Sequence, residues 1–424
     1  MTTLIPKFDL KDGNSTPTGA VNRPINEKLA EVVSVKDFGA TGDGTTDDTI
    51  ALQAAFDANM PLYFPLGIYK ITTGLTFNPY LTYVGENYSL GGGTSPVTIK
   101  AATVGITMLK PKTQYGYQTQ FTNIFLDGDN KAAIGFQWLC TAGGDQADLT
   151  MTNVGAFNCT SKGYDLQLIS YSQFTNVHTR NCPIGFYMKS CVSSQLSNCE
   201  FYCITTAGLY LDSCAFLRIY NCYAFNSGAI NHLVLVDGGH GNKFEKCQFE
   251  TAPSPTTQTN NAVTVTNSYY ATDNCTDNTF LNCEWIGISG SCICNLNIGE
   301  GLSNPNQIYK TKVINCSFIK PVSTSSIELA AQRYTQIFNS IDTRIYNDAD
   351  YFNVSVSNDS PNIYYQEGFP GTFYNPVTAK TLGVQEGNVQ PASITGYSLI
   401  YLDVADNKLK IVSSAGVVRT ITTT

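Results

Sequence analysis

Three glutamates stand beside a recurring dipeptide, and carboxyl groups at repeated spacing are candidates for acid–base chemistry. Glu200 and Glu284 directly follow an Asn-Cys pair, and Glu250 lies three positions after Cys247. Hydrolysis of a glycosidic bond needs two carboxyl groups, one to protonate the leaving oxygen and one to activate water or attack the sugar. The elements that carry these glutamates decide whether any two can act together.

The Asn-Cys dipeptide itself indicates a repeat architecture. Its copies begin at Asn158, Asn181, Asn198, Asn221, Asn282 and Asn315, with Lys246-Cys247 as a variant. The steps between the cysteines are 23, 17, 23, 25, 36 and 33 residues. A repeat of about 20 to 25 residues is typical of a solenoid, in which each repeat buries its face against its neighbours.

Each repeat carries at least two short strands. Residues 196–201 and 280–285 alternate apolar and polar positions around the dipeptide, and a second run follows, as at 185–188 and 208–211. This period of two, rich in aromatic and branched residues, indicates strands. We therefore predict an all-β parallel β-helix with like residues about 4.8 Å apart on successive coils. Asn suits the bend, because it tolerates unusual backbone angles, and Cys fills the narrow core.

Strand alternation places the three glutamates outside if the aromatic residue next to each points inward. Glu200 and Glu284 then share one column three coils apart, about 14 Å, which is too far for a pair acting on one bond. Glu250 lies one coil from Glu284 and two residues along, about 8 Å by strand geometry. Inverting glycosidases separate their carboxyl groups by about 6.5–9.5 Å. We expect Glu250 and Glu284 as the catalytic pair, with solvated surface acids as the alternative.

Asp212 and Asp237 form a second candidate pair, in a column that also holds Lys189. Carboxylates on adjacent coils repel unless they are protonated or bridged, although Asp is also common where strands end in turns. Outer residues could also contact sugar rings, with packing as the alternative. The candidate substrate-binding residues are Glu200, Tyr202, Tyr210 and Tyr223.

Composition excludes several classes of function. The net charge of −8 disfavours nucleic acid as a partner, and no apolar run of about 20 residues could span a membrane. The first residues lack the pattern of a signal peptide. We expect the 14 cysteines to be free and buried. Zinc at Cys199/Cys203 or Cys292/Cys294 is the alternative, but no paired Cys-x-x-Cys set and only three His occur, so we expect no metal or cofactor.

Residues 33–71 combine a turn-rich stretch, a helix and strands. The sequence VKDFGATGDGTTDDTIALQAAFDA leads into LYFPLGIYKI, with helical spacing from Ile50 to Phe56 and Thr46 or Asp47 as the expected N-cap. This segment closely resembles the opening of the pectate-lyase-like right-handed parallel β-helix proteins, in particular the bacteriophage tailspikes. From about residue 121 to 319 the resemblance is one of general coil style.

The resemblance implies a capping helix, a turn at Asp43, Asp47 and Asp48 with a calcium site as the lesser alternative, and a function. Tailspikes of this kind cleave a bacterial surface polysaccharide, such as capsule, O-antigen or exopolysaccharide. The resemblance therefore implies a homotrimeric depolymerase of the virion tail that joins another tail protein through its N-terminus. Hydrolysis is favoured. A polysaccharide lyase, with Arg180, Arg218 and Lys243 as a basic column, and a non-catalytic receptor-binding spike are the alternatives.

We expect three domains. Residues 1–32 resemble a virion-attachment leader, residues 33–335 form the capped β-helix, and residues 336–424 form a β-rich segment for capping or trimerisation. Within the last segment, Asp406-Asn407 stands between two strand-like runs, which predicts a hairpin. The coils between Cys247 and Cys316 are the longest, so their extra residues, such as 252–261, are expected to form loops that wall a groove.

Overall fold

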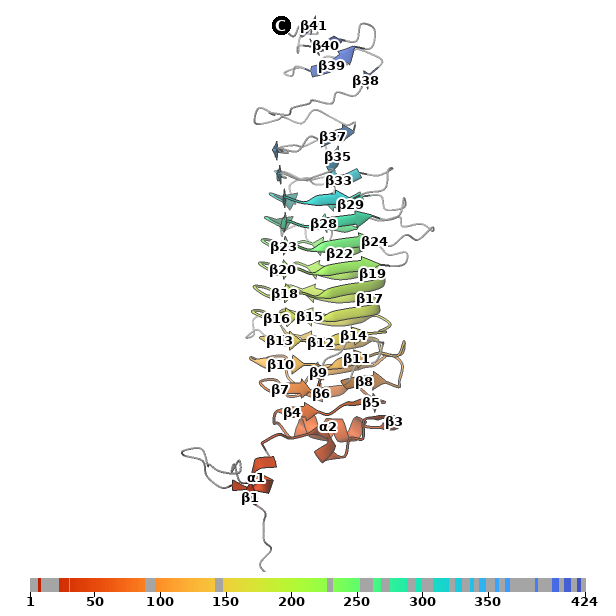
Figure 1. Ribbon diagram of the computed structural model, residues 1–424, viewed down its shortest axis with the longest axis vertical. Coiled ribbons are helices and arrows are strands. Elements are labelled where there is room, and N and C mark those ends of the chain that lie inside the picture. Colours follow the sequence, from red (N-terminus) through yellow and green to blue (C-terminus); the bar gives the residue numbers. More distant parts are fainter. Residues whose placement is uncertain are drawn as a thin grey trace, which may run out of the picture.

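Stacked parallel strands build most of the molecule, which is a long column in Figure 1. The computed structural model describes residues 7–8, 23–29, 31–87, 97–141, 148–226, 232–251, 262–267, 275–287, 294–298 and 308–319, with further short strands between 325 and 420. Each coil contributes three strands, here called rows A, B and C in chain order. The expected parallel β-helix is confirmed.

Row A is a 12-stranded parallel sheet of short strands. Its strands are β4 (Leu62–Phe64), β7 (Thr82–Gly85), β10 (Thr119–Thr122), β13 (Leu149–Thr152), β16 (Gln173–Thr175), β18 (Gln195–Ser197), β20 (Arg218–Tyr220), β23 (Lys243–Glu245), β27 (Thr279–Leu281), β31 (Lys312–Ile314), β34 (Gln336–Phe338) and β36 (Ser355–Ser357).

Rows B and C belong to one 21-stranded sheet, because β17 (His178–Lys189) and β19 (Glu200–Asp212) run through both rows. The other strands of row B are β3 (Asp43–Asp47), β5 (Gly67–Ile71), β8 (Val97–Ala101), β11 (Phe125–Asp127), β14 (Gly155–Phe157), β21 (Tyr223–Asn226), β24 (Gln248–Thr251), β28 (Glu284–Gly287) and β32 (Ser317–Ile319). Those of row C are β6 (Leu75–Phe77), β9 (Thr107–Pro111), β12 (Ile134–Leu139), β15 (Lys162–Gln167), β22 (His232–Asp237), β25 (Val263–Thr266), β29 (Cys294–Ile298), β33 (Ser325–Leu329), β35 (Thr343–Asn347) and β37 (Ile363–Gln366).

A helix covers the N-terminal end of the column, as the resemblance implied. Helix α2 (Thr49–Asp57) buries Leu52 and Phe56, and the Phe56 ring lies 5.2 Å from that of Tyr83. The N-cap is Asp48, not Thr46 or Asp47, and its carboxylate turns away from the helix to accept N–H bonds from Thr41 and Gly42. Asp48 thus occupies the N-cap position, but its side chain stabilises the preceding turn instead of bonding a helix N–H group.

Asp43 and Asp47 also fold this turn. Asp43 accepts the backbone N–H groups of Thr46 and Thr45, and these bonds lower its pKa. Asp47 accepts from Thr49. Two further short elements precede the turn, the 3-10 helix η1 (Val35–Phe38) and α1 (Ile25–Leu29), and β1 (Lys7–Phe8) pairs antiparallel with β2 (Arg23–Pro24).

The Asn-Cys repeat belongs to two corners of the coil, where the sequence predicted one. Asn198, Asn221, Lys246, Asn282 and Asn315 stand between rows A and B, all with φ between 50° and 54°. Asn158 and Asn181 stand at the corner between rows B and C, and the Asn181 amide donates to Asn158. The repeat changes corner between Cys182 and Cys199. The step between these cysteines is therefore 17 residues, although paired strands of adjacent coils there are 22 residues apart.

The positive φ explains why Asn recurs. Left-handed backbone costs most residues about 1–2 kcal/mol, whereas Asn and Gly adopt it readily. The amides also bond one another, since Asn221 donates to Asn198 over 2.7 Å. At the same corner Asn176 donates to Asn153, and Asn153 to Asn123.

Aromatic rings and thiols fill the core. The Tyr164 and Phe186 rings stack 4.2 Å apart, and those of Phe244 and Phe280 stack 4.9 Å apart. Eleven cysteines among the described residues are free and buried. Burial raises the pKa of Cys222 and of Cys214, which keeps these thiols protonated.

Parallel pairing continues beyond residue 335. Row A extends to β36 and row C to β37 (Ile363–Gln366), past the expected domain boundary, and the division into three domains stays a prediction. A separate sheet contains β38 (Glu386–Gly387), β39 (Leu399–Asp403), β40 (Lys408–Val412) and β41 (Val418–Thr420). The antiparallel pairing of β39 with β40 forms the hairpin expected there. A further two-stranded pairing joins β26 (Cys275–Thr276) to β30 (Ile308–Tyr309). Among the described helices, none has the length and apolar character to cross a membrane.

The corner conformation predicts opposite effects for two substitutions. Asn221→Ala should destabilise the protein by about 1 kcal/mol or more, because Ala resists positive φ and lacks the amide. Lys246→Asn should stabilise it, because Lys246 is the corner residue that interrupts the run of Asn. Urea unfolding of each variant measures the change. Asn221→Gly is the control, since Gly keeps the backbone conformation and should cost less than Ala; an equal cost for both would contradict the backbone argument.

The buried thiols predict their own reactivity. A thiol reagent such as Ellman's should leave at least eleven of the 14 cysteines unmodified in the native protein and modify all 14 in denaturant. Rapid reaction of more than three thiols per chain under native conditions would show that the core is open.

Candidate functional site

The outward side chains of row B form two adjacent columns. Pairing of β19, β21, β24 and β28 aligns Glu200 with Tyr223, Gln248 and Glu284, and the column two positions along holds Tyr202, Phe225, Glu250 and Ile286. Glu200 and Glu284 are thus three coils apart, and Glu250 lies one coil from Glu284 and two positions along, as expected. We call these side chains, with His178 and Arg180 on β17, the row B face.

Glu200 turns toward the preceding coil. Its carboxylate lies 3.2 Å from Nδ1 of His178 and accepts N–H bonds from Nη2 of Arg180 at 3.2 and 3.3 Å. The hydrogen bond from His178 and the charge of Arg180 lower the pKa of Glu200, although burial opposes this. The side chain keeps 24% of its surface exposed, so a ligand can still reach it. Glu200 is therefore an ionised acceptor at neutral pH.

The other two glutamates each take one donor from the preceding coil. The Tyr223 hydroxyl donates to Glu250, and the Gln248 amide reaches Oε2 of Glu284 at 3.4 Å. Burial, followed by the bond to Glu250, raises the pKa of Tyr223, so this hydroxyl keeps its proton and donates. Glu250 and Glu284 are both partly exposed. The two carboxyl groups consequently differ in environment, because a phenol donates more strongly than a distant amide.

Aromatic rings border the glutamates. Tyr202 and Phe225 lie 5.3 Å apart between ring centroids, and Phe225 stacks on Tyr223 at 5.9 Å with an interplanar angle of 13°. All three side chains are partly exposed. Rings of this kind can pack against the apolar face of a sugar while the carboxylates accept its hydroxyl hydrogens. The structure brings Tyr202 and Tyr223 together with the three glutamates.

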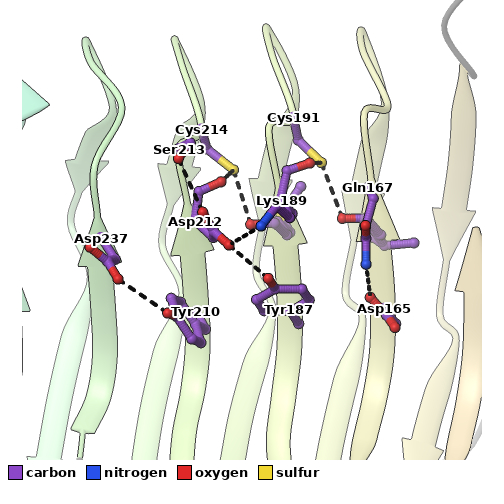
Figure 2. A network of polar contacts seen from close by, with 12 residues as sticks. Asp165, Gln167, Tyr187, Lys189, Cys191, Tyr210, Asp212, Ser213, Cys214 and Asp237 are labelled. Carbon is purple, nitrogen blue, oxygen red and sulfur yellow. Dashed lines mark hydrogen bonds and ion pairs between the residues drawn. The ribbon is translucent and has the colours of Figure 1, made fainter. Parts of the chain in front are cut away.

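The second predicted pair, Asp212 and Asp237, lies on row C, where pairing aligns the two residues as expected. Figure 2 shows that each carboxylate leans toward a tyrosine of the preceding coil. Tyr187 donates to Asp212 at 2.7 Å, and Tyr210 donates to Asp237 at 3.2 Å. Lys189 adds an ion pair to Asp212 at 3.0 Å. Each of the two acids thus has its own donor on the preceding coil.

Burial separates this group from the row B face. Asp212 and Asp237 are 5% and 3% exposed, and Asp165 in the same network is 4% exposed. Asp165 takes an ion pair from Lys162 and amide bonds from Gln137 and Gln167. Glu200 begins β19 and Asp212 ends it, twelve positions further on. The row C acids, with Tyr210, therefore lie away from the glutamates and are enclosed by their partners, which favours a structural role.

The three basic residues named for the lyase alternative lie on two rows. Pairing aligns Arg218 with Lys243 on row A, but Arg180 lies on row B, so the three do not form one basic column. No cluster of three or more potential metal ligands occurs in the described part of the chain. Cys292 and residues 252–261 lie outside the described residues.

Sequence reasoning missed His178. It is 4% exposed, with Nε2 on Asn176 and Nδ1 on Glu200, and no motif in the sequence singled it out. The signal that could have found it is the 22-residue step from His178 to Glu200, one coil in this part of the chain.

Comparisons with known proteins agree with this architecture. Residues 32–289 match the family model described as rhamnogalacturonase A/epimerase, pectate lyase-like. A glucan 1,3-beta-glucosidase of Cochliobolus carbonum is 30% identical over 207 residues, 42% of this chain and 26% of that protein. The pre-neck appendage protein of Bacillus phage phi29 is 26% identical over 220 residues, 47% of this chain and 24% of that protein. The chain thus spans about a quarter of the length of these relatives.

Solved structures show the same fold at low sequence identity. ORF18 of Geobacillus virus E2 aligns with a TM-score of 0.51 at 16% identity, covering 94% of this chain and 88% of that one. The surface protein and adhesin PfbA of Streptococcus pneumoniae aligns with a TM-score of 0.53 at 12% identity, covering 81% and 97%.

The matched region contains the N-terminal cap and every glutamate of the row B face. The family model and the phage relatives confirm the resemblance to tailspike-like β-helix proteins that the opening residues indicated. The chain therefore belongs to the rhamnogalacturonase A/epimerase, pectate lyase-like family of parallel β-helix proteins.

Proposed function

We propose that this chain is a tail component of a bacteriophage that binds and depolymerises a bacterial surface polysaccharide on its row B face. The observation that carries the proposal is the alignment of three partly exposed glutamates and three aromatic rings on one outer face of the β-helix. Polysaccharide-acting enzymes and a phage appendage protein among the relatives support it. The substrate would be capsule, O-antigen or exopolysaccharide.

Hydrolysis would use Glu250 and Glu284. Their backbone positions lie about 8 Å apart by strand geometry, which suits an inverting reaction with water between the carboxyl groups. Tyr223 donates to Glu250 and holds its carboxyl group in place, and Glu250 would activate water. Glu284 has the weaker donor, Gln248, and would protonate the leaving oxygen. Glu200 and the rings would hold neighbouring sugars.

Two alternatives have specific support. Each glutamate of the face already has a hydrogen-bond partner, which would suit a receptor-binding spike that holds a glycan without cleaving it. Arg180 beside Glu200 would suit a lyase, in which a cation neutralises the carboxylate of a uronic acid. A homotrimer, and attachment to another tail protein through the N-terminal residues, complete the proposal.

Substitution of the two glutamates tests the hydrolytic pair. Glu250→Gln and Glu284→Gln should each reduce the rate of cleavage of the host polysaccharide by about 10²–10⁴-fold, because each removes one acid–base group. Oligosaccharide release, followed by gel filtration, measures the rate. Glu245→Gln is the matched control, since Glu245 is a partly exposed glutamate of row A that pairs with Lys243. Wild-type rates in either site variant would show that the pair is elsewhere.

Product absorbance separates the three chemistries. We expect chain shortening without new ultraviolet absorbance, because hydrolysis adds water and leaves no double bond. New ultraviolet absorbance would instead identify the unsaturated uronic acid that a lyase forms by elimination. Retention of the polysaccharide on immobilised protein with unchanged chain length would favour the receptor-binding spike.

A further inference from the structure

A directional chain of side-chain amides runs along the corner between rows A and B and ends at the row B face. The Asn123 amide donates to the backbone carbonyl of Gly85 at 3.2 Å. Asn153 then donates to Asn123 at 2.9 Å, and Asn176 donates to Asn153 at 2.7 Å. We call these three residues the corner amide chain.

The starting point of this chain fixes its direction. A backbone carbonyl can only accept, so the NH₂ group of Asn123 must face Gly85 and its oxygen must face Asn153. The same reasoning passes through Asn153 to Asn176, whose oxygen then faces Nε2 of His178 at 2.9 Å. An amide oxygen needs a donor opposite it, so Nε2 of His178 carries a proton.

The other ring nitrogen, Nδ1, also needs a proton between itself and Glu200. Nδ1 of His178 lies 3.2 Å from Oε2 of Glu200, and a neutral ring protonated at Nε2 would present a lone pair to that oxygen. One proton must therefore lie between Nδ1 and Oε2. Arg180 contacts both oxygens of Glu200 and stabilises the ionised carboxylate, which leaves the proton on the ring.

We infer that His178 is held as an imidazolium by the corner amide chain, and that His178 and Asn176 are positioning residues that orient Glu200 as an ionised acceptor for polysaccharide hydroxyls. The role in ligand binding rests on the proposed function, whereas the protonation state does not. Glu200 faces the imidazole from the following coil, and Arg180 lies two positions further along β17. The preceding coil presents the uncharged Gly155. Without its Nδ1 proton the ring would present a lone pair to the carboxylate and would no longer hold Glu200.

Nuclear magnetic resonance of ¹⁵N-histidine protein tests the protonation state, because the chain has only three histidines. His178→Gln assigns the signals by loss. We expect both ring nitrogens of His178 to show protonated shifts at pH 7. A proton on Nε2 alone, or on Nδ1 alone, would overturn the inference.

Matched corner variants test the role of the amide chain. Asn176→Gly keeps the positive φ of 54° but removes the oxygen opposite Nε2, so the ¹⁵N signals of the His178 ring should change. Asn221→Gly is the control, because this corner residue has φ 50° and bonds Asn198 rather than a histidine. Unchanged His178 signals in Asn176→Gly would contradict the coupling.

A binding measurement tests the positioning role. His178→Gln and Glu200→Gln should each weaken polysaccharide affinity about tenfold at pH 7, as expected for loss of one hydrogen bond to a charged group, with kcat within about twofold of wild type. A reduced kcat at unchanged affinity would overturn the positioning role. If the wild type neither binds nor cleaves polysaccharide, the proposed function fails while the resonance result still decides the protonation state.

Discussion

Parallel hydrogen bonding between coils sets each side chain about 4.8 Å from its counterparts above and below. At this distance identical neutral groups attract, so amides bond amides, rings stack on rings and thiols lie among thiols. Identical charges repel, and each such acid is bonded by a donor of the preceding coil. Asp212 and Asp237 each lean onto a tyrosine of the preceding coil, and Glu200 leans onto His178 and Arg180. Most polar features of the molecule follow from this one spacing.

The same spacing explains how much the sequence could predict. Stacking forces a repeat into the sequence, so the β-helix, the capping helix and the alignment of Glu200, Glu250 and Glu284 followed from counting residues. The assignment of both Asn-Cys groups to one corner failed because both corners need positive φ and a small core residue, and the dipeptide meets both needs equally. The prediction of the N-cap residue was wrong because Asp48 binds the preceding turn, a contact that local spacing does not encode.

Burial is the property of the candidate site that the sequence could not give. Sequence placed Asp212 and Asp237 in one column but could not reveal that Tyr187, Lys189 and Tyr210 enclose them. His178 was overlooked because its partners come from two coils, Asn176 from its own coil and Glu200 from the next. A residue with such partners has no local signature, whereas a column of like residues has a strong one.

The long coils of 36 and 33 residues keep the same strand register as the coils of 22 or 23. Twelve positions separate the end of β24 at Thr251 from the start of β25 at Val263, yet Glu250 still aligns with Ile286 beside Glu284. Insertions at that corner therefore leave the carboxylates in place. Descendants of such a protein can change the length and composition of the inserted residues while keeping the positions of Glu250 and Glu284. The β-helix thus lets this corner vary independently of the row B face.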